Sequence, residues 1–323
     1  MPDDDLPYLT RLTLRLIDGV EKLPEETRAR HTNYLISEQR PDGGWPGREG
    51  GSDLYYTGFA LRSLAVMQAL TPELCERTAG FLRSQMNRST GVVDFFSLIV
   101  GTYLVPLGGG PDVLAEAPAD WKDRVVAMLE TFRTPDGGYG KVPGAPAGST
   151  YTSFLVALCL QLLDRPIPQI ENVVAFVNSR RRPDGGYVEI APMKRSGANP
   201  TAAGVGLLQI AKAMSPEATT AVGDFLAALP SPFEGGFRAN DRIPAADLLS
   251  TFTASWTLFQ LGAEKKLNLA AIRDYADSCE LPRGGFIGGL WDERPDVEYT
   301  FYGLGTLALT ADVPRPPGAF SKG

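Results

Sequence analysis

The chain of 323 residues is poor in the side chains that hold transition metals, with one histidine and three cysteines. His31 stands alone, and Cys75, Cys159 and Cys279 are far apart in the sequence. The chain therefore lacks the closely spaced His/Cys sets that are typical of structural zinc sites. An odd number of cysteines within apolar segments is typical of reduced packing residues, so we expect a cytoplasmic protein.

A basic excess, a signal peptide and a long apolar run are also missing. The net charge of -7 and the pI of about 5.0 argue against a nucleic-acid partner, which needs a basic stripe to displace phosphate counterions. The acidic start at residues 1–5 has no basic n-region followed by an apolar run. The apolar segments stop after about 13 residues, whereas a membrane span needs about 20, so no membrane span is expected.

Glycine, in contrast, is abundant and recurs in a pattern. Five Gly-Gly-aromatic triplets begin at residues 43, 137, 185, 235 and 284. The last three intervals are 48, 50 and 49 residues, and the first interval of 94 residues fits two steps with one degenerate unit between them. A period of this length indicates one supersecondary unit stacked on its copies, and predicts six repeats.

Two kinds of helical segment alternate within each repeat. Before a triplet the segments are amphipathic, as in residues 121–132, whereas after it they are apolar almost all round, as in residues 151–160, 252–261 and 299–309. A helix without a polar face must be surrounded by protein, so the apolar segments are expected to form an inner ring. The glycines between the two helices allow positive φ and end the preceding helix.

The predicted fold is therefore all-α, an (α/α)6 barrel or α-α toroid of six helical-hairpin repeats. We expect the barrel to span residues 25–311, after an N-terminal extension over residues 1–24 that contains a short helix. Residues 312–323 contain a Pro-Arg-Pro-Pro-Gly run and are expected to form a flexible tail.

The Gln-x-x-Asp-Gly-Gly-aromatic loops and the Tyr/Phe-Thr starts of the apolar helices resemble the repeat of protein prenyltransferase β subunits and squalene cyclases, which are α-α toroids. The resemblance covers residues 25–311. In the last repeat, residues 284–286 and the string Asp-Val-Glu-Tyr-Thr-Phe-Tyr-Gly-Leu at 296–304 are most similar to the Rab geranylgeranyltransferase β subunit. Such a pattern is specific for the fold and much less so for activity.

The resemblance implies a zinc ion held by an Asp-x-Cys pair on the fifth inner helix and a His on the sixth. Matching residues 256–261 to the family's Trp-x-Leu-x-x-Leu puts Ser250 at the Asp place and Phe252 at the Cys place. If the register slides so that Asp247 takes the Asp place, Leu249 takes the Cys place. Neither register supplies the sulfur ligand that zinc prefers.

The place of the histidine ligand falls on Tyr299, and the only histidine of the chain, His31, lies in the first outer helix. All three ligands are thus missing. We expect no metal and no cofactor, and no zinc-dependent prenylation of protein cysteines.

The resemblance to cyclases implies an Asp-x-Asp-Asp general acid, which must present a protonated carboxyl in a dry pocket. The only similar string is residues 3–5, which read as a solvated terminal segment. Terpene cyclisation is therefore not expected.

The family's isoprenoid diphosphate site is the part that this sequence retains best. Basic residues precede the fourth and fifth inner helices, where free N–H groups favour anions: Lys194, Arg195, Arg238 and Arg242. They are the candidate diphosphate ligands, and solvated charges on turns are the alternative. Aromatic residues at the tops of inner helices are the candidate lining of an isoprenoid pocket, with plain core packing as the alternative: Tyr55, Tyr151, Phe252, Trp256, Tyr299 and Tyr302.

Single carboxylates lie near the same end of the barrel, at Asp94, Asp247, Asp296 and Glu298. They could serve as acids or bind magnesium, but at the starts of helices they are more typical of caps.

Three functions remain open. The first is a prenyltransferase β-subunit-like protein that binds an isoprenoid diphosphate or another lipid without the zinc chemistry. The second is an active non-zinc enzyme on an isoprenoid substrate, and the third is a non-catalytic interaction scaffold, so the sequence leaves enzymatic activity undecided. It also leaves open whether the chain pairs with an α-subunit-like helical partner, forms a homo-oligomer or acts alone.

Overall fold

The computed structural model describes residues 6–86, 88 and 91–313. The acidic string at residues 3–5 and the tail from residue 314 onward lie outside the described residues.

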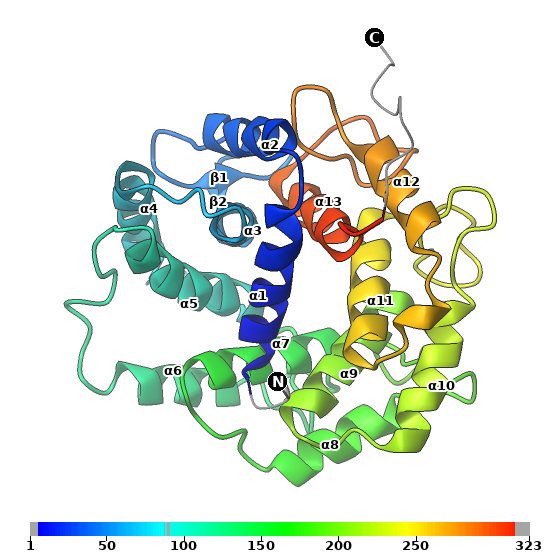
Figure 1. The fold of residues 1–323 in the computed structure, drawn as a ribbon. Coiled ribbons are helices and arrows are strands. Elements are labelled where there is room, and N and C mark those ends of the chain that lie inside the picture. The colour runs from blue at the N-terminus through cyan, green and yellow to red at the C-terminus, as the bar shows by residue number, and fades with distance from the viewer. Residues whose placement is uncertain (1–5, 87, 89–90, 314–323) are drawn as a thin grey trace.

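Outer and inner helices alternate along the chain and form two concentric layers (Figure 1). The outer helices are α2 (Glu25–Ser37), α4 (Pro72–Gln85), α6 (Trp121–Glu130), α8 (Ile170–Ser179), α10 (Pro216–Ala227) and α12 (Leu269–Cys279). The inner helices are α3 (Leu54–Val66), α5 (Val92–Leu107), α7 (Thr150–Leu162), α9 (Ala198–Ile210), α11 (Leu248–Gln260) and α13 (Val297–Leu309).

The inner helices form a closed ring. Each inner helix contacts the next one along the chain, and α13 returns to contact α3. This closure confirms the predicted α-α toroid, and α4 and α5 occupy the place of the degenerate unit between the first two triplets. Because each inner helix touches two inner neighbours and the outer layer, it can be apolar on nearly every side.

The Gly-Gly-aromatic loops anchor each inner helix by the same contacts. In the second loop Gly137 has a φ of 90°, which favours glycine, and the Tyr139 side chain is fully buried. The backbone N–H of Tyr139 donates to the Ser153 hydroxyl of α7 at 2.9 Å. The same bond joins the other triplets to their inner helices, in the pairs Trp45–Thr57, Tyr187–Thr201, Phe237–Thr251 and Phe286–Thr300. Loop and helix are therefore positioned together.

Almost all of the described chain is helix or loop. Two short strands, β1 (Trp45–Pro46) and β2 (Ser52–Asp53), pair within the first loop, and a 3-10 turn, η2 (Glu264–Lys266), precedes α12. Within the described residues, no helix combines the length and the apolar character that crossing a membrane requires.

The first helix, α1 (Tyr8–Glu21), lies across the ring at the end where the inner helices finish (Figure 1). Its Tyr8 backbone N–H donates to the side chain of Gln161 near the end of α7, and Arg11 reaches Gln209 near the end of α9. Its Gly19 packs directly on the backbone of Ala308 near the end of α13. The helix therefore closes one end of the barrel and leaves the loop end open.

Candidate functional site

A cavity of about 580 Å³ lies inside the inner ring. All six inner helices contribute to its wall, α1 contributes Tyr8, Leu9 and Leu12 at the closed end, and the post-glycine loops surround its mouth. Ligand sites in proteins typically have volumes of about 300–1,000 Å³ and mostly apolar walls. The cavity is thus large enough for a small lipid-like molecule.

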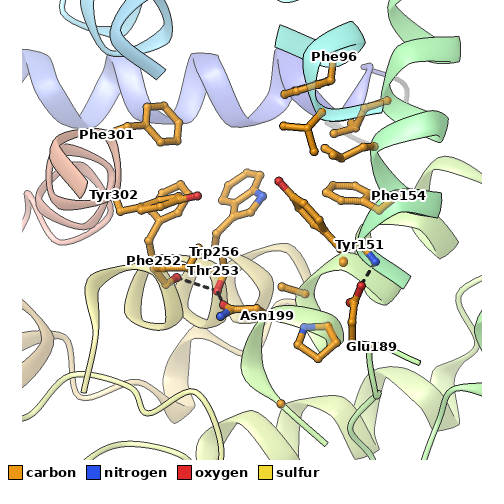
Figure 2. Close-up of a pocket in the computed structure, with 18 of the residues that line it drawn as sticks. Phe96, Tyr151, Phe154, Glu189, Asn199, Phe252, Thr253, Trp256, Phe301 and Tyr302 are labelled. Carbon is orange, nitrogen blue, oxygen red and sulfur yellow. Dashed lines mark hydrogen bonds between the residues drawn. The ribbon is translucent and has the colours of Figure 1, made fainter. Parts of the chain in front are cut away.

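Five of the six aromatic residues predicted for an isoprenoid pocket line this cavity: Tyr55, Tyr151, Phe252, Trp256 and Tyr302. Figure 2 shows four of them around one space, Tyr151 from α7, Phe252 and Trp256 from α11 and Tyr302 from α13, and Tyr55 comes from α3. Tyr151 has 38 % of its surface exposed and contributes to the cavity wall. Tyr299 is not part of the lining, since its ring lies beside the Arg48 guanidinium at 5.4 Å.

The four predicted diphosphate ligands do not gather at one place. Arg195 lies at the mouth of the cavity and forms an ion pair with Asp241, whereas exposed Lys194 and Arg242 are not part of the lining. Arg238 turns toward the end of α10, where its guanidinium donates to the backbone carbonyl groups of residues 228 and 229. The mouth also carries Lys141, which the sequence analysis did not single out.

The three places implied for zinc ligands hold no metal-binding set. Ser250 donates its hydroxyl to Asp247 at 2.8 Å, and Phe252 packs against the rings of Phe301 and Tyr302. Over residues 6–86, 88 and 91–313, no three His, Cys, Asp or Glu side chains form a cluster that could hold a metal ion. Asp247 caps α11, as its position at the start of that helix suggested.

Of the charged residues that line the cavity in the described part of the chain, Arg62 lies on an inner helix, whereas Lys141, Glu189 and Arg195 come from loops. Arg62 comes from α3, and its guanidinium lies over the Phe301 ring at 4.1 Å and near the Phe59 ring at 5.6 Å. Burial lowers the pKa of the Arg62 guanidinium, whereas the nearby phenol groups of Tyr302 and Tyr151 act in the opposite direction. Because arginine normally titrates above about 12, the group remains a cation at neutral pH.

Glu298 is a second ionisable residue, besides Arg62, with a shifted pKa, and it lies beside the cavity. Its Oε1 accepts a hydrogen bond from the Tyr55 hydroxyl at 2.6 Å. Burial raises the pKa of the Glu298 carboxyl to about 7, although the hydrogen bond from Tyr55 opposes that shift. The carboxyl is therefore partly protonated at neutral pH.

Polar groups that the sequence analysis overlooked complete the wall. Thr253 donates to the Asn199 side chain at 2.8 Å, linking α11 with α9 (Figure 2). Glu189 accepts hydrogen bonds from the Ser149 hydroxyl and from the Tyr151 backbone N–H at the start of α7. A sequence signal existed for Arg62, because a single charge in an otherwise apolar inner helix is costly unless it has a use.

The sequence profile of the prenyltransferase alpha-alpha toroid domain matches residues 6–188, 108–237 and 201–315. No curated protein shows significant sequence similarity to the chain.

Solved structures with the same architecture include Candida albicans protein geranylgeranyltransferase-I complexed with GGPP. It has a TM-score of 0.69 and 13% identity, over 87% of this chain and 90% of that one. The type II terpene cyclase MstE from Scytonema has a TM-score of 0.61 and 12% identity, over 91% of this chain and 98% of that one. A variant of that cyclase in complex with geranylgeranyl dihydroxybenzoate, its substrate, has a TM-score of 0.60 and 12% identity, over 94% and 99% of the two chains. At such identities the likeness shows the fold.

Proposed function

The chain belongs to the prenyltransferase alpha-alpha toroid domain family, and from that premise we propose that its barrel binds an isoprenoid chain, as a diphosphate or as another lipid. We further propose that it does so without the zinc-dependent chemistry of protein prenylation. The single observation that carries the proposal is the aromatic-lined cavity of about 580 Å³ inside the inner ring. Two proteins of similar fold bind geranylgeranyl compounds, GGPP in one and geranylgeranyl dihydroxybenzoate in the other.

The physical reason is the burial of apolar surface. An isoprenoid chain gains about 0.8 kcal/mol for each buried CH₂ equivalent, and the rings of Tyr151, Phe252 and Trp256 offer flat apolar faces to it. Lys141 and Arg195 at the mouth provide positive charge that favours an anionic ligand over a neutral one.

The zinc-independent part of the proposal rests on the residues at the implied ligand places. Phe252 and Tyr299 cannot coordinate zinc as Cys and His do, and Ser250 is hydrogen-bonded to the cap of α11. A role as a pure scaffold is less well supported, since the barrel axis is open rather than filled.

Catalysis without zinc is the second candidate, and one observation favours it. The carboxyl of Glu298, with a pKa of about 7 that burial raises, is hydrogen-bonded to Tyr55 in the cavity wall. A group of this kind is suited to proton transfer at neutral pH. Carbocation chemistry fits less well, because the Arg62 cation in the wall would oppose a developing positive charge.

We also propose a cytoplasmic location. The three cysteines are buried and unpaired, which suits a reducing, cytoplasmic environment. Whether a helical partner or a second copy binds the outer layer can be tested by light scattering of the purified chain.

The test is a calorimetric titration with geranylgeranyl diphosphate, in the presence of zinc, of EDTA or of neither. We expect saturable binding with the same affinity in all three buffers. Ala202→Phe, which adds a ring to the cavity wall on α9, should weaken binding by at least about 10-fold. The matched control Ala115→Phe adds the same ring to an exposed loop and should bind as the original chain does.

Absence of binding heat in every buffer would overturn the proposal of an isoprenoid site. Binding that requires zinc would overturn only the proposal that the zinc chemistry is missing. Equal weakening by both phenylalanine substitutions would show that the ligand binds outside the cavity.

A further inference from the structure

Arg62 has no counter-charge among the described residues. Its guanidinium lies near the Phe301 and Phe59 rings, and it forms no hydrogen bond or ion pair with any described residue. A guanidinium that lies over a ring is stabilised through its face, but its five N–H donors point outward in its plane. No described residue forms a hydrogen bond with those donors, and Arg62 is part of the cavity lining, so they are available to a ligand.

Arg62 is half-buried and is part of the cavity lining. An enclosed cation without a partner is costly, because much of its hydration is lost and no protein group replaces it. The chain retains this cost in the wall of a largely apolar cavity. Such a feature is typical of a functional site, where the missing partner is the ligand.

Phenol groups surround the guanidinium. The hydroxyls of Tyr8, Tyr55, Tyr151 and Tyr302 are all close enough to interact with it electrostatically. Burial raises the pKa values of all four, so they are neutral. The Tyr55 hydroxyl already donates to Glu298, whereas the other three can donate to a ligand. In Figure 2 the hydroxyl groups of Tyr151 and Tyr302 point into the space between α7 and α13.

No acid in the wall neutralises this cluster. Of the described residues that line the cavity, Glu189 is the only acidic one. It comes from the loop before α9 and accepts hydrogen bonds from Ser149 and Tyr151 at the start of α7. Glu298 lies outside the lining and accepts from Tyr55.

Much of the remaining lining is apolar. The lining from α5, α7 and α9 includes Val93, Phe96, Val100, Phe154, Leu155, Leu158, Ala202 and Ala203. The cavity thus combines a cationic part, formed by Arg62 and the tyrosines of α1, α3, α7 and α13, with a largely apolar remainder.

We propose that the cavity binds an anionic amphiphile, an isoprenoid carboxylate or phosphate, with its anionic oxygens on Arg62 and the neighbouring tyrosine hydroxyls. The apolar chain then lies along the wall formed by α5, α7 and α9. This inference rests on the proposed isoprenoid site, and it assigns the headgroup to the inside of the barrel rather than to Lys141 and Arg195 at the mouth.

The test compares three ligands with the same chain but different heads: geranylgeranoic acid, geranylgeranyl monophosphate and the neutral geranylgeraniol. The original chain should bind at least one of the two anions at least about 10-fold more tightly than the alcohol. Preference for the acid or for the phosphate tells which anion the site takes.

The variants then locate the headgroup. Arg62→Met keeps the length of the side chain and removes its charge, so the preference for the anion should fall to within about 2-fold of the alcohol while the alcohol binds at least as tightly as before. Arg62→Lys should retain part of the preference. Tyr151→Phe should weaken anion binding by a smaller factor, and Arg195→Met at the mouth should lower the preference by less than Arg62→Met does. Arg124→Met, on an exposed helix outside the cavity lining, is the control and should leave the preference unchanged.

A stability measurement separates this role from a structural one. Because Arg62→Met removes an unpaired buried charge, the ligand-free variant should have an equal or higher Tm than the original chain. Tight binding of all three ligands without preference for the anions would overturn the inference while leaving the isoprenoid site intact. Loss of anion preference in Arg195→Met but not in Arg62→Met would overturn it as well, and so would a lowered Tm of Arg62→Met with unchanged preference.

Discussion

At the scale of single residues, the barrel carries ionisable groups in places where their charge is costly. Glu298 is the clearest case. It lies in the first turn of α13, and its side chain accepts a hydrogen bond from Tyr55 on α3. Burial raises its pKa to about 7, and the neighbouring Asp296 acts in the same direction, against the hydrogen bond from Tyr55. The native state therefore holds this proton more tightly than the unfolded chain does.

The pH dependence of stability follows from that difference. Between about pH 4.5 and pH 7 the unfolded state releases the Glu298 proton before the native state does, so stability falls as the pH rises through this window. Glu298→Gln removes this pH-dependent loss of stability, because glutamine does not ionise, and it keeps an acceptor for the Tyr55 hydroxyl. We expect the variant to gain up to about 2 kcal/mol on the original chain between pH 5 and pH 8, after allowance for its partial exposure.

Urea unfolding at four pH values between 5 and 8 measures this effect. Glu116→Gln, in an exposed loop, is the matched control and should follow the curve of the original chain. Parallel curves for Glu298→Gln and the original chain would contradict the assignment of a raised pKa to this carboxyl.

At the scale of elements, small residues let the loops and helices approach each other closely. A Cβ atom on Gly303 of α13 would lie 2.3 Å from Cγ of Phe286, the buried aromatic residue of the last triplet. Gly80 of α4, in contrast, has no heavy atom within 4 Å of the corresponding position. The two glycines have the same intrinsic helix propensity and opposite surroundings.

Substitution by alanine should therefore change stability in opposite directions. Gly303→Ala forces Phe286 or the backbone to move and should cost about 1–3 kcal/mol. Gly80→Ala lowers the entropy of the unfolded chain without a clash and should stabilise by about 0.5–1 kcal/mol. Chemical denaturation of both variants measures the pair, and the same sign for both would show that helix propensity rather than packing dominates in α13.

At the scale of the whole molecule, the ring closes through contacts between its first and last units. Arg48, after the first triplet, donates to both carboxylate oxygens of Asp292 at 2.6 and 2.9 Å and to Asp296 at 2.7 Å. Nearby, His31 of α2 accepts from the Gly285 backbone N–H and stacks on Phe286. The single histidine of the chain is thus part of the closure.

Removal of Arg48 should weaken the contact between the first and last units of the ring, called the seam below, and so lower the stability of the protein. Burial opposes ionisation of Asp292, but the bonds from Arg48 and from the Gly288 N–H outweigh it and lower the pKa of that carboxyl to about 2. Arg48→Met leaves two nearly buried carboxylates unpaired and should cost about 3 kcal/mol at pH 7. The cost should shrink as the pH falls below about 4, where the unpaired carboxylates can take up protons.

The matched control is Arg124→Met, which breaks the exposed pair with Asp120 and should cost less than about 1 kcal/mol. Thermal unfolding of both variants at pH 7 and pH 4 provides the comparison. Equal small losses for the two variants would mean that the seam at Arg48 contributes no more than a surface ion pair.

Most of the fold could be predicted from the sequence, because the patterns that specify it are local. Each Gly-Gly-aromatic triplet ends one helix and anchors the next, and the inner segments are apolar on every side, as in α7 and α13. The aromatic residues of the cavity lining could be predicted for the same reason, since Tyr55 and Tyr151 lie in the first turn and Tyr302 in the second turn of an inner helix. A repeated local pattern needs no knowledge of distant contacts.

The tertiary structure alone decided which charges face the cavity. Arg195 and Arg238 both precede inner helices, yet Arg195 reaches the mouth and Arg238 the end of α10, because the loop conformation sets the direction of a long side chain. The placement of α1 across one end was likewise not visible in residues 1–24. Above all, Arg62, Tyr151 and Tyr302 come together only when the ring closes, since residues far apart in sequence become neighbours through packing that no local signal records.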